Sequence, residues 1–241
     1  MREGLDMHER PRRDGDLVRD PRRTLAIGVA MLCGVGLLAI VVASDVAEPP
    51  FLRGVDDAWR RTSLGWPGWI ESLGEAFERL GAGVVMVPFR IAIAVWLAIR
   101  RRRWDLGAWL LGWVLADVIT AVLKPGLARE RPTAIDPEDP FTSFPSAHAK
   151  TAAQVAVGLV LVTSSPWRSR RPWGVLAVVW IVLMALSRTV VDHHWLSDVI
   201  AGSLLGAGAA LLSAATLQLI RDDRARDRDT QLTGRSDERD T

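Results

Sequence analysis

Residues 24–43 read TLAIGVAMLCGVGLLAIVVA, twenty consecutive residues without a charged side chain. Because a helix rises about 1.5 Å per residue, this stretch is long enough to cross the roughly 30 Å hydrocarbon core of a bilayer. It is longer than the apolar core of a typical signal peptide, and it follows a long charged segment. The stretch therefore predicts a membrane-spanning helix.

Five further apolar stretches repeat this pattern along the chain. They are residues 81–99, 106–123, 151–165, 173–186 and 196–220. The stretches 151–165 and 173–186 are short, so five or seven spans remain alternatives to a count of six. The predicted fold class is all-α, a polytopic membrane protein with six transmembrane helices in a domain over residues 24–220.

The two ends of the chain have a different composition. The 241 residues carry 30 basic and 28 acidic side chains, a formal net charge of +2, and many of these charges fall in residues 1–23 and 221–241. Such segments bury too little apolar surface to offset the entropy of ordering, so both are predicted to be disordered tails. A single cysteine, Cys33, excludes an intrachain disulfide and a cysteine-based metal cluster.

The distribution of arginine predicts the orientation of the spans. Four segments are rich in Arg: 1–23, 100–103, 166–172 and 221–241. Six spans place all four on one side, which the positive-inside rule makes the cytoplasmic side of the cell membrane, together with both termini. These clusters account for the basic character of the chain, so no nucleic-acid partner is expected. Three regions then face outward: 44–80, 124–150 and 187–195.

The first outward region contains a helical pattern over about residues 66–80. Apolar residues recur near helical spacing, with glutamates between them: Trp66, Trp69, Ile70, Glu71, Leu73, Glu75, Phe77, Glu78 and Leu80. The pattern fits an amphipathic helix lying in the membrane interface and equally a helix packed on the top of the bundle. Within the spans, Arg90 and Asp117 lie at comparable depth, and because such charges are costly in a membrane we predict an ion pair, with a substrate role as the alternative.

The other two outward regions contain three short patterns of basic and histidine residues. They are Lys124-x6-Arg131-Pro132, Pro145-Ser146-Ala147-His148 and Ser187-Arg188-x5-His194-x3-Asp198. Cations and imidazoles without a thiol or carboxylate cluster favour a bound phosphoryl group. Taken singly, the arginines fit lipid contacts, and the histidines and the His194–Asp198 pair fit structural roles. Their convergence on the face opposite to the other arginines favours a site.

The residues around Ser146 precede an apolar run and are predicted to begin a helix. Ser146 would cap that helix, and the free N–H groups of its first turn would point at a phosphate. Ala147 keeps the backbone donor and is tolerated if its φ is negative.

The order and spacing of these three patterns resemble the signature of the type-2 phosphatidic acid phosphatase superfamily, over residues from about 50 to 220. Ala147 stands where the family usually has Gly. The resemblance implies a metal-independent, cofactor-free hydrolase that works through a phosphohistidine. His194 would be the nucleophile, Asp198 would orient its ring, and His148 would be the general acid.

The resemblance also implies the substrate site and the substrate. The phosphate would be held by Lys124, Arg131, Ser146, Ala147 and Arg188. The substrate would be a lipid phosphate in the outer leaflet, either a polyprenyl diphosphate such as undecaprenyl diphosphate or a phosphatidate-type lipid. A lipid phosphotransferase and a catalytically inactive lipid-binding relative are the alternatives. Vanadate-dependent haloperoxidases have a similar motif set, but they are soluble, which argues against them here. The oligomeric state is left open.

Overall fold

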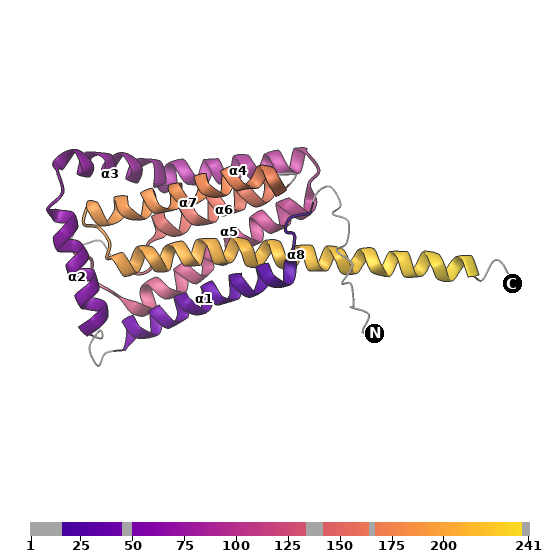
Figure 1. Cartoon of the computed structure of the whole chain (residues 1–241), viewed down its shortest axis with the longest axis horizontal. Coiled ribbons are helices and arrows are strands. Elements are labelled where there is room, and N and C mark those ends of the chain that lie inside the picture. Colours follow the sequence, from indigo (N-terminus) through magenta and orange to yellow (C-terminus); the bar gives the residue numbers. More distant parts are fainter. Residues whose placement is uncertain (1–15, 45–49, 134–141, 164–166, 238–241) are drawn as a thin grey trace, which may run out of the picture.

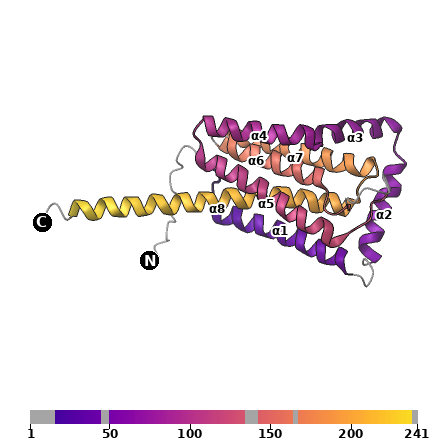
Figure 2. The same ribbon diagram turned by 180° about the vertical axis from the view of Figure 1, so that it is seen from behind.

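The computed structural model describes residues 16–44, 50–133, 142–163 and 167–237, and within these ranges the regular structure is entirely α-helical. The helices are α1 (Pro21–Ala43), α2 (Pro50–Leu64), α3 (Gly68–Gly81), α4 (Gly83–Ile99), α5 (Arg103–Leu127), α6 (Ala147–Thr163), α7 (Trp167–Val190) and α8 (Leu196–Asp237). Helix α8 lies in the bundle with α1, α5 and α6 packed around it, as Figures 1 and 2 show from opposite sides. Helix α2 crosses one end of the bundle, which we call the α2 end (Figure 1).

The apolar stretches of the sequence all fall in helices of this bundle. Helices α1, α5, α7 and α8 are long and apolar enough to cross a membrane, and α3 with α4 would supply a fifth span. Helix α6 is also apolar but has 17 residues. The predicted all-helical membrane protein is thus confirmed, whereas the count of six crossings stays a prediction.

Helices α3 and α4 form one bent element rather than two separate ones. They meet at Ala82, whose extended backbone gives a bend of 46° between the two axes. Helix α3 packs on α7, where the rings of Phe77 and Trp180 lie 5.8 Å apart, while Trp69 and Leu73 stay exposed. The helix thus packs on the bundle with one side, while a location of its exposed apolar side in the membrane interface stays a prediction. The helix that lies across the end of the bundle is α2, which the sequence patterns did not predict.

The described parts of the two charged tails have defined positions in the structure. Leu17 and Val18 are buried in the main hydrophobic core, and the Leu17 N–H donates to Gln218 Oε1 at 2.9 Å. At the other terminus α8 continues as a helix to Asp237 and extends well beyond the bundle (Figure 1). Helix propagation from an existing span costs little, and Arg–Asp pairs one turn apart, such as Arg226 with Asp223, support it. Residues 1–15 and 238–241 lie outside the described part.

The Arg-rich segments lie at the end of the bundle opposite to α2. The start of α1, the connection between α4 and α5, and the charged extension of α8 are all found there (Figure 1). This placement agrees with the prediction that these segments share one side of the membrane. Which side is the cytoplasm remains a prediction.

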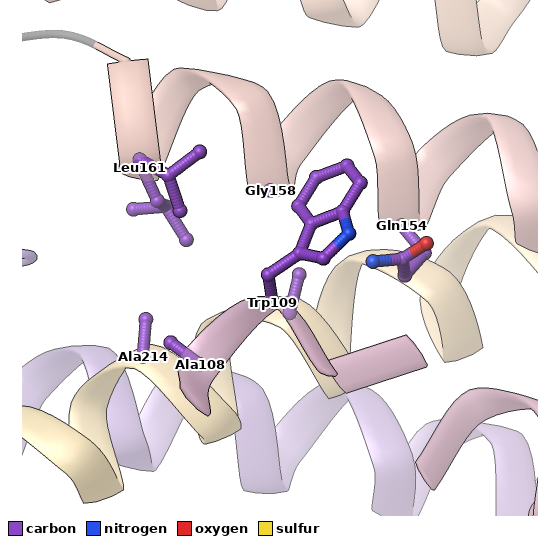
Figure 3. A pocket seen from close by; sticks show the side chains of 8 residues that line it. Ala108, Trp109, Gln154, Gly158, Leu161 and Ala214 are labelled. Atoms are coloured by element: carbon purple, nitrogen blue, oxygen red, sulfur yellow. The ribbon is translucent and has the colours of Figure 1, made fainter. Parts of the chain in front are cut away.

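The core between α5 and α6 depends on a glycine. Trp109 of α5 points toward α6 between Gly158 and Gln154 (Figure 3), and a Cβ atom at Gly158 would lie 2.8 Å from Trp109 Cζ3. The cavity that remains there has a volume of about 10 Å³, room for one water at most. This region is therefore packed core rather than a ligand site.

A second glycine brings α8 against the start of α6. A Cβ atom at Gly202 would overlap the carbonyl oxygen of Ser146, so only glycine permits this approach. The Ser146 N–H in turn donates to the carbonyl oxygen of Asp198 at 3.1 Å. Two of the three sequence patterns are joined by this contact.

The predicted intramembrane ion pair is present and has a third member. Arg90 Nη1 lies 3.4 Å from Asp117 Oδ2, and Arg90 is buried. Lys150 of α6 also bonds to the Asp117 carboxylate, and Trp113 Nε1 donates to it at 2.7 Å. The pair therefore links α4, α5 and α6.

Candidate active site

The three sequence patterns meet at the α2 end of the bundle. Lys124 is in the last turn of α5, and Arg131 follows in the connection after it. His148 is in the first turn of α6, and Arg188 and His194 flank the turn between α7 and α8. The antiparallel order of the helices brings these segments to the same end (Figure 1).

His194 and Asp198 form a buried pair. His194 Nδ1 lies 3.5 Å from Asp198 Oδ2, with 3% and 0% of the two side chains exposed. The same carboxylate oxygen accepts the Trp195 N–H at 2.9 Å, which fixes its direction. Because Nδ1 faces the carboxylate, Nε2 is the nitrogen left for chemistry.

The environment of His194 keeps its ring neutral. The pKa of His194 is lowered to about 4, mainly by burial and also by the positive charges of Arg188 and Arg131, which together outweigh the raising effect of Asp198. At neutral pH the imidazole is therefore uncharged, as a nucleophile must be.

Arg188 and Arg131 lie around the turn between α7 and α8. Arg188 is 2% exposed, its Nη2 lies 2.7 Å from His193 Nδ1, and its Nη1 lies 2.9 Å from Glu78 Oε1. Arg131 Nη1 donates to the His193 carbonyl at 3.1 Å. Burial and the charge of Arg188 lower the pKa of His193, so this ring is also a neutral partner. A carboxylate of α3 thus occupies the cationic face of the site.

Two predictions about the second pattern have different outcomes. Ala147 is the first residue of α6 and is not among the residues with positive φ, so the condition for tolerating alanine is met. The prediction that Ser146 caps α6 was wrong. Its hydroxyl is fully buried and has no hydrogen-bond partner within the described residues, and its N–H is held by Asp198 instead. The Ser146 hydroxyl therefore does not serve as a helix cap here.

Lys124 is directed toward the segment that precedes this pattern. Its Nζ donates to the Thr142 carbonyl at 2.5 Å, and Thr142 Oγ1 donates back to the Lys124 carbonyl at 2.8 Å. Lys124 therefore joins the end of α5 to the chain leading into Ser146.

The elbow between α3 and α4 lies directly over the site. A Cβ atom at Gly81 would be 2.9 Å from His148 Cδ2, so glycine is required where the elbow passes the imidazole. Phe77 and Glu78 are in the last turns of α3 and face different surroundings. Glu78 meets Arg188, whereas Phe77 lines a groove described next.

An apolar groove of about 580 Å³ runs between α3–α4 and α6–α7. Its wall includes Phe77, Met86, Phe89, Leu159, Trp180 and Leu183. Because Phe77 and Glu78 are adjacent in α3, the groove begins beside the cationic face of the site. The arrangement provides an apolar surface for a long chain next to charged groups for a polar head.

Sequence reasoning missed a second group of buried charges behind Asp198. Arg129 contacts Asp198 at 2.7 Å and Asp56 of α2 at 2.8 Å, and Ser197 bonds to Asp56. No sequence pattern indicates that α2 contacts the connection after α5. The one feature that could have drawn attention to this connection is Arg129 itself, an arginine two residues before the predicted site residue Arg131. Among the described residues, no three His, Cys, Asp or Glu side chains are grouped as metal ligands.

Fold and site together define an all-helical membrane protein with buried arginines and histidines at one end. The model of the PAP2 superfamily matches residues 105–222. Phosphatidylglycerophosphatase B of Bacillus subtilis is 31% identical over 144 residues, covering 57% of this chain and 70% of that protein. Undecaprenyl-diphosphatase of Sulfolobus acidocaldarius is 35% identical over 144 residues, covering 56% of this chain and 65% of that protein.

The fold is also similar to that of a solved PAP2-type phosphatase. The crystal structure of a transmembrane PAP2-type phosphatidylglycerolphosphate phosphatase from Bacillus subtilis superposes with a TM-score of 0.64 at 24% identity. The superposition covers 82% of this chain and 96% of that one. The chain belongs to the PAP2 superfamily, which confirms the resemblance found in its three sequence patterns.

Proposed function

We propose that this protein is a membrane phosphatase that removes a phosphoryl group from a lipid phosphate or diphosphate. The observation that carries the proposal is the buried His194–Asp198 pair, with Arg188 and Arg131 around it and the apolar groove beginning alongside. Cations suit the phosphate, and the groove suits the lipid chain. The relatives named phosphatidylglycerophosphatase B and undecaprenyl-diphosphatase support these two substrate classes.

The proposed reaction has two steps through a phosphohistidine. Nε2 of His194 attacks phosphorus, the bond from phosphorus to the leaving oxygen breaks, and His148, protonated while the anionic substrate is bound, donates its proton to that oxygen. Asp198 stabilises the imidazolium that forms. Water then attacks phosphorus, assisted by His148 as a base, and free phosphate leaves with His194 restored. A monoester releases a lipid alcohol in the first step, and a diphosphate releases a lipid monophosphate.

The cationic side chains would stabilise the charge that develops on the phosphoryl oxygens. Arg188, Arg131 and Lys124 would provide most of this stabilisation, with the buried Ser146 hydroxyl and the first-turn N–H groups of α6 as further donors. No metal ion is needed in this scheme, so we expect hydrolysis to continue in EDTA.

The test of the reaction is phosphate release in detergent from undecaprenyl diphosphate, phosphatidate and phosphatidylglycerophosphate. We expect the wild-type protein to release phosphate from at least one lipid, with or without EDTA, and the His194→Ala variant to release none. His8→Ala is the control for loss of a histidine elsewhere. Full activity of His194→Ala, or loss of wild-type activity in EDTA, would refute the mechanism. Transfer to an acceptor without free phosphate would identify a phosphotransferase.

The groove has its own test, because two adjacent valines of α7 differ in their surroundings. Val179 lines the groove, whereas Val178 is 60% exposed and does not. Val179→Trp should raise the KM for a long-chain lipid phosphate and leave the KM for a short, soluble phosphate ester unchanged. Val178→Trp should change neither value. Equal effects of the two variants would exclude the groove as the chain-binding surface.

We also propose that the α2 end faces the outside of the cell membrane and that both termini lie in the cytoplasm, with α6 as the sixth span. The clustering of Arg at the opposite end supports this orientation. After Cys33 is replaced by Ser, a cysteine introduced at exposed Leu64 should react with an impermeant maleimide in intact cells. A cysteine introduced at Arg228 should react only after the cells are permeabilised. The reverse labelling pattern would show that the protein has the opposite orientation in the membrane.

A further inference from the structure

Behind the His194–Asp198 pair, one buried guanidinium joins two carboxylates. Arg129 is in the connection after α5 and only 5% of its side chain is exposed. Its Nη1 lies 2.7 Å from Asp198 Oδ1, and its Nη2 lies 2.8 Å from Asp56 Oδ2, whose side chain is 1% exposed. A charge this deeply buried is tolerated only with such partners.

The Asp56 carboxylate is itself held on both oxygens. Oδ1 accepts the Ser197 N–H at 2.9 Å, and Oδ2 accepts the Ser197 hydroxyl at 2.6 Å as well as Arg129. Arg129 Nη1 also donates to the Ser197 hydroxyl oxygen at 2.7 Å. Ser197 directly precedes Asp198 in α8, so α2 is bonded to the turn of α8 that carries the catalytic carboxylate.

The two oxygens of Asp198 therefore have separate tasks. Oδ1 is held by Arg129, and Oδ2 faces His194 while accepting the Trp195 N–H. Asp56 shares the positive charge of Arg129, which limits how strongly that charge is drawn to Asp198. Without the charge of Asp56 the guanidinium would be drawn more strongly to Asp198, and less of the negative charge of Asp198 would act on the imidazole of His194.

We propose that Asp56 and Arg129 are positioning residues, which hold the Asp198 carboxylate and share its charge so that it orients His194 for attack. The inference rests on the proposed phosphatase function and adds two residues to it. Asp56 and Arg129 bond to Ser197 and Asp198, whereas Arg188 and Arg131 bond to Glu78 and His193. Phosphate binding is therefore expected to be separable from the effect of Asp56 and Arg129.

The test compares turnover with phosphate affinity in matched variants. Asp56→Asn keeps the shape of the side chain but removes its charge, and we expect kcat to fall about 100-fold, as misplacement of a catalytic group does. The inhibition constant of inorganic phosphate, which reports on the cations, should stay within about threefold because those groups are untouched. Asp57→Asn, the same change at the neighbouring position of α2, should leave both values at the wild-type level.

Two substitutions of Arg129 test whether a conservative change preserves part of the activity that a charge-removing change loses. Arg129→Lys keeps the charge but cannot bridge two carboxylates in the same plane, so a loss of about tenfold in kcat is expected. Arg129→Met leaves Asp56 and Asp198 without their cation, and kcat should fall further than in the lysine variant. Arg61→Lys, on the exposed side of α2, is the control for an arginine-to-lysine change.

Several results would overturn the proposal. It fails if Asp56→Asn has the kcat of Asp57→Asn. It also fails if kcat and phosphate affinity fall together, since that pattern indicates a collapsed site. If Asp56→Asn does not fold, the Arg129→Lys variant decides by the same two measurements. Failure of the proposed function is distinguishable, because then the wild type would release no phosphate or His194→Ala would remain active.

Discussion

The carboxylate of Glu78 occupies a position where a phosphate oxygen would be expected. Its Oε1 lies 2.9 Å from Arg188 Nη1 and 3.3 Å from His193 Nδ1, and 31% of its side chain is exposed. Under the proposed function, a phosphate oxygen that binds Arg188 through Nη1 competes with Glu78 for this nitrogen. The change Glu78→Gln removes the competing charge and keeps the size of the side chain, so it should strengthen phosphate binding.

The size of this effect can be worked from the contact. Two unit charges about 3 Å apart attract by roughly 5 kcal/mol at an effective dielectric constant near 20. Desolvation and lost side-chain entropy leave about 1.5–3 kcal/mol for a hydrogen bond to a charged group. Because Glu78 is almost one-third exposed, the lower end of this range applies, and about 1.4 kcal/mol corresponds to a tenfold change in affinity.

The assay is competitive inhibition of lipid-phosphate hydrolysis by inorganic phosphate. We expect the inhibition constant in Glu78→Gln to be about tenfold lower than in the wild type. Glu75→Gln is the matched control, because Glu75 is on the same helix and pairs with Arg79 at 3.4 Å, one turn along the surface. An unchanged or weaker affinity in Glu78→Gln would show that Glu78 supports Arg188 instead of competing with phosphate, and would refute the reasoning.

Three further predictions concern pH and two small residues. The acid limb of the pH profile of kcat/KM should lie well below pH 6.5. The reason is that the pKa of His194 is lowered to about 4, mainly by burial, so the ring stays neutral as the pH falls through 6.5. A limb at pH 6.5 in the pH–rate profile would contradict this. Ala147→Gly should change kcat/KM by less than about tenfold, since alanine already fits the first turn of α6, and a gain of several hundredfold would contradict it. Gly202→Ala should lower the thermal unfolding temperature in detergent and abolish phosphate release, because the new methyl group overlaps α6. Gly174→Ala, which has open space around it, should do neither.

Several features of the site could be predicted from sequence because they are encoded locally. The helical spacing of His194 and Asp198 places both on one face of a turn, and the structure brings them within 3.5 Å. Two charges in apolar segments, Arg90 and Asp117, had few possible partners except each other, and they do pair. In the first case a short sequence pattern limits the possible partners of the residue. In the second case the high free energy of an unpaired charge in lipid does so.

The remaining features depend on contacts between distant segments. Asp56 is one of several acidic residues before α3, and only the packing of α2 across the end of the bundle brings it to Arg129. Lys150 is a lone lysine in α6 until the fold places it beside the charges of α4 and α5. Ser146 has the residue type of a helix cap, but its hydroxyl has no hydrogen-bond partner among the described residues, and its N–H joins α6 to Asp198. Residue type alone could not indicate these partners.

Two groups of charged residues flank the site: Asp56, Arg129 and Asp198 on one face, and Glu78 and Arg188 on the other. Asp56 and Asp198 share the single positive charge of Arg129, so the group behind His194 repels an incoming phosphate less than two free carboxylates would. On the opposite face, Glu78 balances Arg188 only while the site is empty of substrate, since a phosphate needs the same cation. The lipid chain can offset the displacement of Glu78 by contacts in the groove beside Phe77, whereas a soluble phosphate ester has no such contacts. Under the proposed function, we therefore expect the carboxylate of Glu78 in α3 to favour phosphates attached to a lipid over those free in water.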